Sequence, residues 1–478
     1  MSNSEIGNSN GDDDMPVNSF DDYPMSWRPV LSGKDGQICE ELIAQLKDDI
    51  KNGALLPGTK LPPQRELADY LDINVSTVSR AFKRCEEAGI LTSAVGSGTF
   101  VAYGALHPES LRPHSGASGT IEMGALAPAT MDYEILSKAF RDLAAEDQLT
   151  YLFEYRYESR GLWHKEAATR LMSRMNYTTE PESIFFSSGG QNAIMAVLVS
   201  LFRPGDRIGT DPLVFPGMKS IASLLGIRLV PIRSKDGEFT EEGLLHAIKN
   251  EKIKGLYTTP DFQNPTTRTM SERCKDIIAR TAVKYDVPVI EDQIFSLLMK
   301  KPATTIASRA PGQTVFIASL SKAIAPGLRT AYISAPEKYK SRIDNALSNI
   351  NFCVSPITLE LSSRIIAGEH LDPLLMSVRA NNRVRNLYTS KILKGFELHG
   401  TPDCPFSWLV LPPHIDDQKL EDALHEDHVR IISAPKFAVG NTRPAPAVRL
   451  CSCAPKTEDD LDTALKKIKK HIEQIAFC

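Results

Sequence analysis

Apolar residues recur at helical spacing in the first part of the chain. Ile38, Leu42, Leu46 and Ile50 lie four residues apart, and Gly53 follows the last of them. This spacing places the apolar side chains on one face of a helix, and a glycine just after the run is typical of a helix end. The pattern therefore predicts an amphipathic helix that begins near Ile38.

Two shorter helical patterns and a β-like pattern follow. The helical patterns cover residues 63–71 and 75–88, and the turn Asp72-Ile73-Asn74 separates them. Residues 91–102 then change to a β-like pattern around Gly96-Ser97-Gly98. A helix, a tight turn and a second helix form the helix-turn-helix pattern, and the glycines predict a hairpin tip that can approach another backbone closely.

From about residue 121, short apolar runs alternate with amphipathic stretches such as Gln191–Phe202 and Ser271–Tyr285. This alternation predicts βαβ units and a mostly parallel sheet, the arrangement of an α/β domain. The predicted strands are Ile184–Ser187, Arg207–Thr210, Arg228–Ile232, Gly255–Thr258, Val287–Ile290, Thr314–Ala318 and Thr330–Ser334.

The last part of the chain begins with a helical pattern, continues with strand patterns and ends with a helical pattern over Glu458–Ile475. This order predicts a smaller α+β domain. The sequence thus divides into five segments: an acidic disordered tail at 1–30, the helix-turn-helix with its β hairpin at 35–102, a linker at 103–120, a large α/β domain at 121–354 and a small α+β domain at 355–478.

Composition narrows the class of protein. The chain has 478 residues, of which 42% are hydrophobic, and a formal net charge of −4. Its eight cysteines are scattered without a CxxC pair and without histidines at zinc-ligand spacing, so we expect no metal site and a reducing compartment. The N-terminal tail lacks the features of a signal peptide, and no apolar stretch approaches the roughly 18 residues that span a bilayer. We therefore expect a cytoplasmic protein without a membrane partner.

The second helix of the helix-turn-helix has two different faces. Val78, Phe82 and Cys85 share one face and are expected to pack inward, whereas hydroxyls and cations occupy the other. Hydroxyl and cationic side chains on an exposed helix suit contacts with phosphates and base edges in a major groove. Residues 34–90 contain 8 Lys and Arg against 10 Asp and Glu, so the alternative is a small helical domain with an ordinary charged face.

The run from Leu61 to Ala68 and the order of the elements resemble the GntR family of winged-helix regulators over about residues 36–102. The resemblance implies that the domain binds DNA. One departure is Asp72, where the turn often has glycine, but Asp tolerates the left-handed conformation. By the same resemblance the DNA contacts are Arg65, Ser76, Thr77, Arg80 and Gly98.

Four motifs in the predicted α/β domain carry candidate chemistry. The run Ser187–Gln191 lies between a strand and a helix, where glycines and the helix N-terminus favour a phosphate. Asn264, in an Asn-Pro turn after a buried strand, can donate to a ring oxygen. Asp292 ends an apolar strand, so its carboxylate is expected to point into the ligand crevice or, alternatively, to cap the next helix. Lys322 is flanked by hydroxyls, and Arg329 follows seven residues later.

Together these motifs resemble fold-type I enzymes that use pyridoxal 5′-phosphate (PLP), specifically the class I/II aminotransferases, over about residues 121–478. The resemblance implies that Lys322 binds the cofactor as an imine, that Asp292 pairs with the pyridine nitrogen and that Asn264 contacts the ring hydroxyl. A carboxylate beside that nitrogen keeps it protonated, which makes the ring an electron sink. The candidates for the phosphate are Ser188, Gly190, Gln191, Ser319, Ser321 and Arg329.

The resemblance implies further contacts. Phe215 is similar to the aromatic residue that stacks on the ring, although it can instead be an ordinary core residue, and Arg449 is similar to the arginine that grips a substrate carboxylate. Either Tyr155 or Tyr157 is expected to reach the phosphate of a partner subunit. The family usually has a tyrosine two or three residues after the aspartate, at positions that are Ile294 and Phe295 here. The missing hydroxyl predicts weak transamination at most.

A GntR-type winged helix followed by an aminotransferase-like domain resembles the MocR subfamily of regulators. The resemblance implies a homodimer that binds a promoter operator and senses PLP, or an amine or amino acid that reacts with PLP, with the linker carrying the change to the DNA-binding domains. The alternative from another class is a working aminotransferase, acting on 2-aminoadipate or another amino acid with 2-oxoglutarate, that carries an accessory winged helix. A third hypothesis is a DNA-binding module on an inactive scaffold.

Overall fold

The computed structural model divides the chain into two units, residues 1–105 and residues 106–478. The residues that the structure describes are 25–31, 38–51, 55, 58–87, 90–94, 98–102, 119–126, 133–147, 149–154, 161–440 and 442–476.

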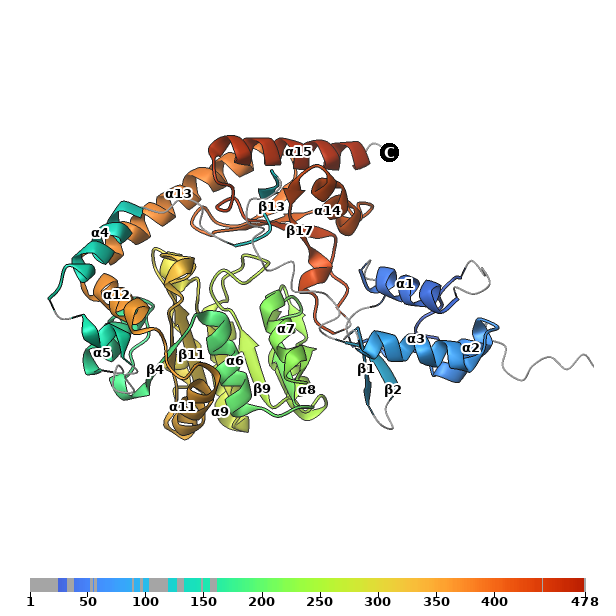
Figure 1. Cartoon of the computed structure of the whole chain (residues 1–478), viewed down its shortest axis with the longest axis horizontal. Helices are drawn as coiled ribbons and strands as arrows, with labels where there is room; N and C mark the ends of the chain where they lie inside the picture. The colour runs from blue at the N-terminus through green and yellow to red at the C-terminus, as the bar shows by residue number, and fades with distance from the viewer. Residues whose placement is uncertain are drawn as a thin grey trace, which may run out of the picture. The chain divides into compact units, whose positions relative to one another are not determined.

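The described residues of the first unit form three helices and a two-stranded antiparallel sheet (Figure 1). Asp72, in the turn between the second and third helices, has a φ of 50°, so it adopts the left-handed conformation that the turn was predicted to need. The predicted inward face is also confirmed, because Val78, Phe82 and Cys85 are at most 1% exposed. The elements are α1 (Ile38–Lys51), α2 (Gln64–Tyr70), α3 (Val75–Glu87), β1 (Leu91–Ala94) and β2 (Gly98–Val101).

The end of the N-terminal tail packs on this unit. The Trp27 side chain is 4% exposed, and its indole N–H donates to the Asp49 carboxylate at 2.6 Å. A buried aromatic ring with a satisfied N–H is a fixed anchor. The prediction of disorder for residues 1–30 is therefore wrong at Trp27. The segment is mostly polar, but the single Trp27 ring provides enough apolar surface to anchor it.

The second unit is built on a seven-stranded sheet with the order β4-β12-β11-β10-β9-β5-β6. All neighbours pair in parallel except β12, which is antiparallel to both β11 and β4. The mostly parallel sheet predicted from the apolar runs is thus present, although β10 begins two residues later than predicted. The strands are β4 (Ile184–Ser187), β5 (Arg207–Thr210), β6 (Arg228–Pro231), β9 (Gly255–Thr258), β10 (Val289–Asp292), β11 (Thr314–Ser319) and β12 (Ala331–Ser334).

Helices cover both faces of this sheet (Figure 1). Along β11, Val315 and Ile317 pack with the helices of one face, while Phe316 and Ala318 pack with those of the other. Burial on both faces explains why the strands appear in the sequence as nearly continuous apolar runs. One face is covered by α6 (Gly190–Leu201), α7 (Pro216–Leu224) and α11 (Glu337–Asn351), and the other by α5 (Leu162–Ser173), α8 (Glu241–Lys249), α9 (Glu272–Tyr285), α10 (Ile306–Arg309) and α12 (Pro356–Ala367).

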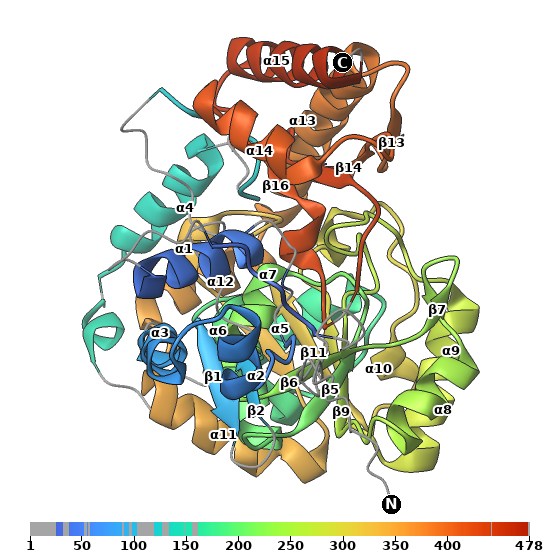
Figure 2. The same ribbon diagram turned by 90° about the vertical axis from the view of Figure 1, so that its right-hand side faces the viewer.

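The C-terminal part forms a smaller α+β domain around a four-stranded antiparallel sheet. In Figure 2 the helices of this domain lie next to its short strands, close to the C-terminus. The strands are β13 (Glu397–His399), β14 (Ser407–Val410), β16 (Ile432–Ser433) and β17 (Ala447–Leu450), and the helices are α13 (Leu371–Ile392), α14 (Asp417–Glu426) and α15 (Glu458–Ala476).

The segment that follows the predicted linker belongs to this small domain. Strand β3 (Ile121–Glu122) pairs in parallel with β15 (Val429–Arg430). The Met123 N–H donates to the Arg430 carbonyl, and the Met123 carbonyl accepts from the Cys451 N–H. The predicted boundary, which assigned residues from 121 onward to the large domain, is therefore wrong for residues 121–126. A two-residue strand has no periodicity that could have revealed this pairing.

Among the described residues, two helical segments lie between β3 and α5 in the sequence. These are α4 (Tyr133–Ala144) and the 3-10 helix η2 (Thr150–Phe153), both of which contact α12. A short hairpin of β7 (Ser234–Lys235) and β8 (Glu238–Phe239) lies beside α9. Within the described part of the chain, no helix combines the length and the apolar character needed to cross a membrane.

Candidate functional site

Asp292 lies at the carboxyl end of β10, where open α/β sheets bind their ligands. Its side chain is 1% exposed, and one carboxylate oxygen accepts a hydrogen bond from the Tyr257 hydroxyl at 2.7 Å. The other oxygen, Oδ1, has no hydrogen-bond partner among the described residues. Burial raises the pKa of Asp292 to about 6. A buried carboxylate with an unused oxygen can hold a proton that lies between it and a basic ring nitrogen.

Lys322 lies in the loop that joins β11 to β12, close to the same edge of the sheet. Its amine donates to the backbone carbonyl of Leu126. Burial, and next the nearby Arg449 guanidinium, lower the pKa of Lys322 to about 8. The lowered pKa increases the neutral fraction of this amine at pH 7 above that of an ordinary lysine. The neutral form is the one that attacks a carbonyl carbon.

Arg329 ends the same loop and lies next to the turn before α6. Its φ of 46° is left-handed, and its Nη2 donates to the Ser188 carbonyl at 3.1 Å. At Gly189, which has a φ of 94°, a Cβ atom would lie 2.5 Å from the Arg329 Nη2. Only glycine fits there, and the result is a guanidinium held against the N-terminus of α6, an arrangement that favours a phosphate.

The remaining phosphate candidates lie around this turn. Ser321 Oγ is buried and has no hydrogen-bond partner among the described residues, while the Ser321 backbone N–H donates to Ser319 Oγ at 3.2 Å. Gly190 packs against Ile294 and Ser319. The Gln191 side chain is exposed, at the first turn of α6. The structure thus places serine hydroxyls, an arginine and a helix N-terminus together.

Arg449, on β17, connects the small domain to the large domain. Its Nη1 donates to Asn264 Oδ1 at 2.7 Å, and its Nη2 donates to the Gly124 carbonyl. Its Nε has no partner within the described chain, although the side chain is only 3% exposed. The rings of Phe406 and Phe437 lie 5.7 and 5.1 Å from its Cζ. A fixed guanidinium with unused donor capacity is suited to bind a carboxylate.

Phe215 precedes α7 and is half-buried. At Gly217 a Cβ atom would lie 2.3 Å from the Phe215 ring, so the absence of a side chain at Gly217 makes room for the ring. The other predicted aromatic contact falls on Tyr155 or Tyr157, and both lie outside the described residues.

The positions where a tyrosine was expected are occupied by apolar side chains in apolar surroundings. Phe295 is 1% exposed, and its ring lies edge-on to that of Phe406, with 5.4 Å between the centroids. Ile294 lies beside Gly190. Neither side chain has a hydroxyl that could stabilise a ring oxygen.

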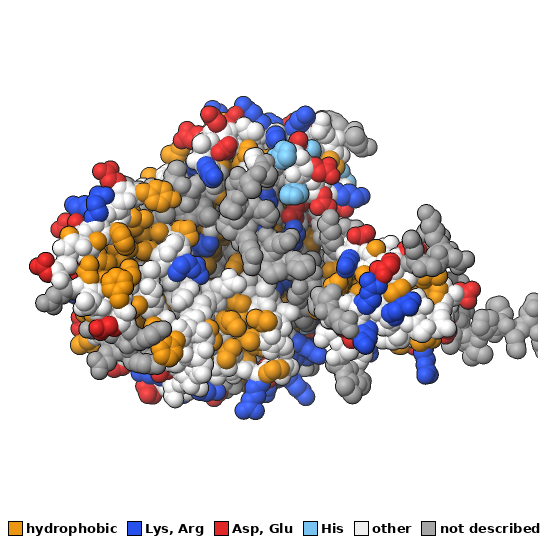
Figure 3. All heavy atoms as spheres, viewed as in Figure 1, with side chains coloured by type: hydrophobic (Ala, Val, Ile, Leu, Met, Phe, Trp, Pro, Cys, Tyr) orange, Lys and Arg blue, Asp and Glu red, His pale blue; other side chains and the backbone are white. Residues whose placement is uncertain are grey.

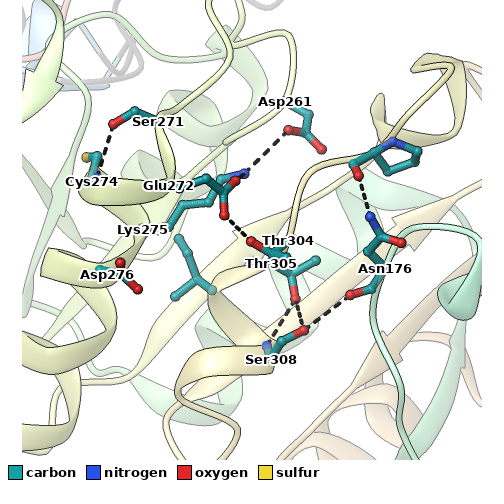
Figure 4. A network of polar contacts seen from close by, with 12 residues as sticks. Asn176, Asp261, Ser271, Glu272, Cys274, Lys275, Asp276, Thr304, Thr305 and Ser308 are labelled. Carbon is teal, nitrogen blue, oxygen red and sulfur yellow. Dashed lines mark hydrogen bonds and ion pairs between the residues drawn. The ribbon is translucent and has the colours of Figure 1, made fainter.

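Polar contacts around the buried Lys275 and Asp261 support the loop that carries Asn264 (Figure 4). Lys275, on α9, has no exposed side-chain surface, and its amine lies 4.0 Å from Asp261 Oδ1 and 3.5 Å from Glu272 Oε1. Neither oxygen of the Asp261 carboxylate has a hydrogen-bond partner among the described residues, and burial raises the pKa of this group. The ammonium of Lys275 is therefore the main partner of the buried Asp261 carboxylate, which lies three residues before Asn264.

The predicted DNA contacts in the first unit are all at the surface. Ser76, Arg80 and Arg65 are exposed, and Thr77 is half-buried. The exposed Gly98 has a φ of 109°, and a Cβ atom there would lie 2.9 Å from Lys60 Cε, so a further cation lies beside the wing. These side chains are available to a ligand without rearrangement of the core.

The sequence patterns did not indicate several of these residues. Tyr257, Gly124 and Leu126 contact the predicted site through a strand interior and through backbone carbonyls. The only sequence signal for Tyr257 is a hydroxyl in an otherwise apolar strand. Backbone carbonyls have no sequence signal, because every residue has one.

Comparison with known proteins supports the same two-part organisation. Residues 158–468 match the family described as aminotransferase class I and II, and residues 38–101 match the bacterial regulatory proteins of the gntR family. The chain is 44% identical over 461 residues to the uncharacterized HTH-type transcriptional regulator YdeF of Bacillus subtilis (strain 168), covering 96% of this chain and 100% of that protein. It is 25% identical over 382 residues to the vitamin B6 salvage pathway transcriptional repressor PtsJ of Salmonella typhimurium, covering 80% and 87%.

Solved structures share the fold of the second unit. An archaeal alanine:glyoxylate aminotransferase matches with a TM-score of 0.68 and 19% identity, over 74% of this chain and 91% of that one. LysN, an α-aminoadipate aminotransferase from Thermus thermophilus, matches with a TM-score of 0.66 and 17% identity, over 75% and 93%. At these identities the similarity establishes the fold, which is that of fold-type I aminotransferases.

Proposed function

The chain belongs to the HTH-type transcriptional regulators that join a GntR winged helix to an aminotransferase class I and II domain, as in the MocR subfamily, and we propose that it is a PLP-dependent regulator that senses an amine or amino acid. The cofactor that this family implies is PLP. The proposal does not require turnover, because a regulator needs only different affinities of its effector for two states of the protein.

The residues of the site fit PLP. The unused oxygen of Asp292 and the unpartnered hydroxyl of Ser321 are buried polar atoms that need a partner, and the narrow space at Gly189 holds a guanidinium at a helix N-terminus. We infer that Asp292 holds a proton at the ring nitrogen, that Asn264 contacts the ring hydroxyl, that Phe215 stacks on the ring and that Lys322 supplies the covalent attachment. Bound PLP supplies an aldehyde that condenses with primary amines. We assign the phosphate to Ser188, Gly190, Gln191, Ser319, Ser321 and Arg329.

One observation carries the regulatory role. Lys322 and Arg449 both donate to backbone carbonyls of one short segment, at Leu126 and Gly124, and this segment follows the linker from the DNA-binding unit. When the Lys322 amine is bonded to the cofactor, it no longer donates to the Leu126 carbonyl. When the Arg449 guanidinium moves toward a carboxylate of the effector, it displaces Gly124, to whose carbonyl it donates. We propose that occupancy of the site is transmitted in this way to the linker and then to the winged helix.

The apolar residues after the cofactor aspartate favour this role over catalysis. The resemblance to aminotransferases implies a tyrosine hydroxyl at position 294 or 295 that stabilises the ring oxygen of PLP. In this chain Phe295 instead makes an edge-on contact with Phe406. We expect transamination with 2-oxoglutarate to be slow at most. The Arg65, Ser76, Thr77, Arg80 and Gly98 surface is the proposed contact with the operator DNA.

We further propose a cytoplasmic homodimer. Hydrophobic side chains gather on the surface over α4, α5 and α12 (Figure 3). Those that are more than a third exposed include Tyr133, Phe140, Phe153, Leu162 and Trp163. An exposed apolar patch of this kind is typical of a protein interface, and a second copy of the chain is the partner that the family resemblance implies.

The test is selection of genomic DNA fragments by the full-length protein, with and without PLP and with a panel of amino acids. We expect enrichment of a small set of fragments and a PLP- or amino-acid-dependent change in their affinity. A second arm measures turnover with 2-oxoglutarate through the absorbance of bound PLP. Rapid turnover without sequence-specific DNA binding would overturn the proposal in favour of an aminotransferase, and a Lys322→Ala protein with unchanged absorbance would show an inactive scaffold.

A further inference from the structure

Lys219 is a buried cation for which the proposed site has no role so far. Its side chain, on α7, is 5% exposed, and its ammonium donates to the backbone carbonyl of Lys436 at 3.0 Å. Burial alone lowers the pKa of Lys219 to about 7, because no carboxylate of the described residues is close enough to offset it. Lysines are almost never fully buried unless they are paired, since the desolvation of an unpaired charge is costly.

The position of Lys219 directs it toward the proposed site. It follows Phe215, the residue before α7, by four residues, and its backbone N–H donates to the Phe215 carbonyl at 3.5 Å, so the two residues are one helical turn apart. Its acceptor, Lys436, belongs to the 3-10 helix η7 (Ala434–Phe437) of the small domain. The next residue, Phe437, has its ring 5.1 Å from the Cζ of Arg449. Lys219 therefore connects the residues around Phe215 with those around Arg449.

The backbone around Lys219 is held by hydrogen bonds between the two domains. The Val214 N–H donates to the Phe437 carbonyl at 2.9 Å, and the Val439 N–H donates to the Pro212 carbonyl at 3.0 Å. We call residues 212–219 and 434–439 the domain seam. These bonds fix both sides of the seam, so the buried ammonium is already in place before any ligand binds, which reduces the entropic cost of recognition.

We propose that Lys219 binds a second acidic group of the effector, and hence that the effector is an amino acid with an acidic side chain. This inference rests on the proposed function of the site. Arg449 takes the α-carboxylate, and Lys219 supplies the counter-charge for the side-chain carboxylate, which in turn supplies the anion that the buried ammonium lacks. Lys219 is thus assigned as the residue that determines effector specificity.

The test compares acids with their amides on the PLP-loaded full-length protein. L-aspartate and L-asparagine, and L-glutamate and L-glutamine, are titrated while the absorbance of bound PLP is recorded. We expect one acid to bind at least about tenfold more tightly than its amide, a difference that corresponds to one buried charge contact. In Lys219→Met we expect this ratio to fall to about two or less, with the affinity for the amide retained, and in Lys219→Arg we expect the preference to persist.

Lys466→Met is the matched control, because the Lys466 side chain is 67% exposed and pairs with Asp462 on the same helix, α15, outside the seam. Its acid-to-amide ratio should equal that of the wild type. The inference is overturned if the wild type prefers neither acid, or if Lys219→Met weakens acids and amides equally, as a purely structural lysine would. A protein whose PLP absorbance and DNA affinity respond to no amino acid would instead overturn the proposed function.

Discussion

The two proposed binding surfaces of this chain are built in opposite ways. In the winged helix the candidate DNA contacts, such as Arg65 and Arg80, are exposed side chains on a separately packed core. In the aminotransferase-like domain, Asp292, Asn264 and Arg449 are at most 5% exposed, and the hydrogen bond from Arg449 to Asn264 joins the two domains. The first surface can change its contacts without affecting stability, whereas the second uses the same residues for binding and for folding.

The largest effect is expected from Lys322→Ala. Removal of the amine eliminates the hydrogen bond to Leu126 and the proposed covalent attachment of PLP. We expect the absorbance of covalently bound PLP to disappear and the effect of amino acids on DNA affinity to be abolished. Lys338→Ala, which removes a surface lysine paired with Asp286, is the control and should leave both readouts unchanged. Retained absorbance in the Lys322→Ala protein would refute the assignment.

A large loss of stability is expected from Lys275→Met, which leaves the Asp261 charge buried without its cation. Breaking a buried pair costs about 3 kcal/mol or more, and removing both charges recovers most of that loss. Urea unfolding followed by fluorescence should therefore show a much lower midpoint for Lys275→Met than for Asp261→Asn/Lys275→Met. Lys284→Met, on the exposed side of the same helix, should behave like the wild type. Equal midpoints for the single and double variants would contradict the prediction.

Arg80→Ala should separate binding from stability. Loss of one arginine contact lowers DNA affinity by about tenfold or more, and the unfolding midpoint should not change because the side chain is exposed. Arg84 offers a comparison on the same helix, since its guanidinium pairs with Glu40 on α1, with Nη2 at 3.1 Å from Oε2. Arg84→Ala should weaken DNA binding less. The contrast fails if Arg80→Ala unfolds at a clearly lower urea concentration than the wild type.

Glu122→Ala should weaken the communication between the two surfaces. One Glu122 oxygen accepts from the backbone N–H groups of Gly124 and Ala125 at 2.7 and 2.6 Å, and the other pairs with Arg430. Coupling free energies between sites are typically about 1–3 kcal/mol, so a response of roughly 5- to 150-fold should shrink markedly. PLP absorbance should remain, because no proposed cofactor contact is removed. Glu397→Ala, at the surface of the small domain, is the control.

The smallest effect is expected from glycine substitutions at two left-handed residues. Thr267, in the buried loop after Asn264, has a φ of 64°, which is unfavourable for a β-branched side chain. Thr267→Gly should therefore raise the free energy of unfolding by about 1 kcal/mol. Asp72→Gly, in the exposed turn of the winged helix, should be nearly neutral because Asp tolerates this conformation. A destabilised Thr267→Gly protein would show that the side chain contributes more than its strain costs.

The sequence predicted the framework of both units, because apolar periodicity and strand-length runs are local signals. The runs that became β4, β5 and β9 have the predicted bounds, and the turn at Asp72 has the predicted conformation. The small-domain pairing of β3 and the burial of Trp27 depend on residues far away along the chain, and each involves too few residues to form a pattern.

The candidate site shows the same division. The motifs around Asp292 and Lys322 were evident because glycines, hydroxyls and charges cluster within a few residues. Lys219 and Lys275 were not evident, since a single lysine on a helix is usually solvated and only the folded structure shows that both are buried. The stabilising partners of these lysines come from other elements, Lys436 in one case and Asp261 in the other.

The direction of β12 has a consequence for how such a site can be inherited. Because β12 is antiparallel to β11, Ser319 lies opposite Ala331, and residues 320–330 leave and re-enter the sheet at neighbouring points. Lys322 and Arg329 both lie in this loop, so an exchange of the loop would replace both residues at once. Recombination that replaced this loop alone would add or remove the covalent anchor and the arginine together. Both proposed cofactor contacts could therefore be gained or lost without any change in the pairing of β11 with β12.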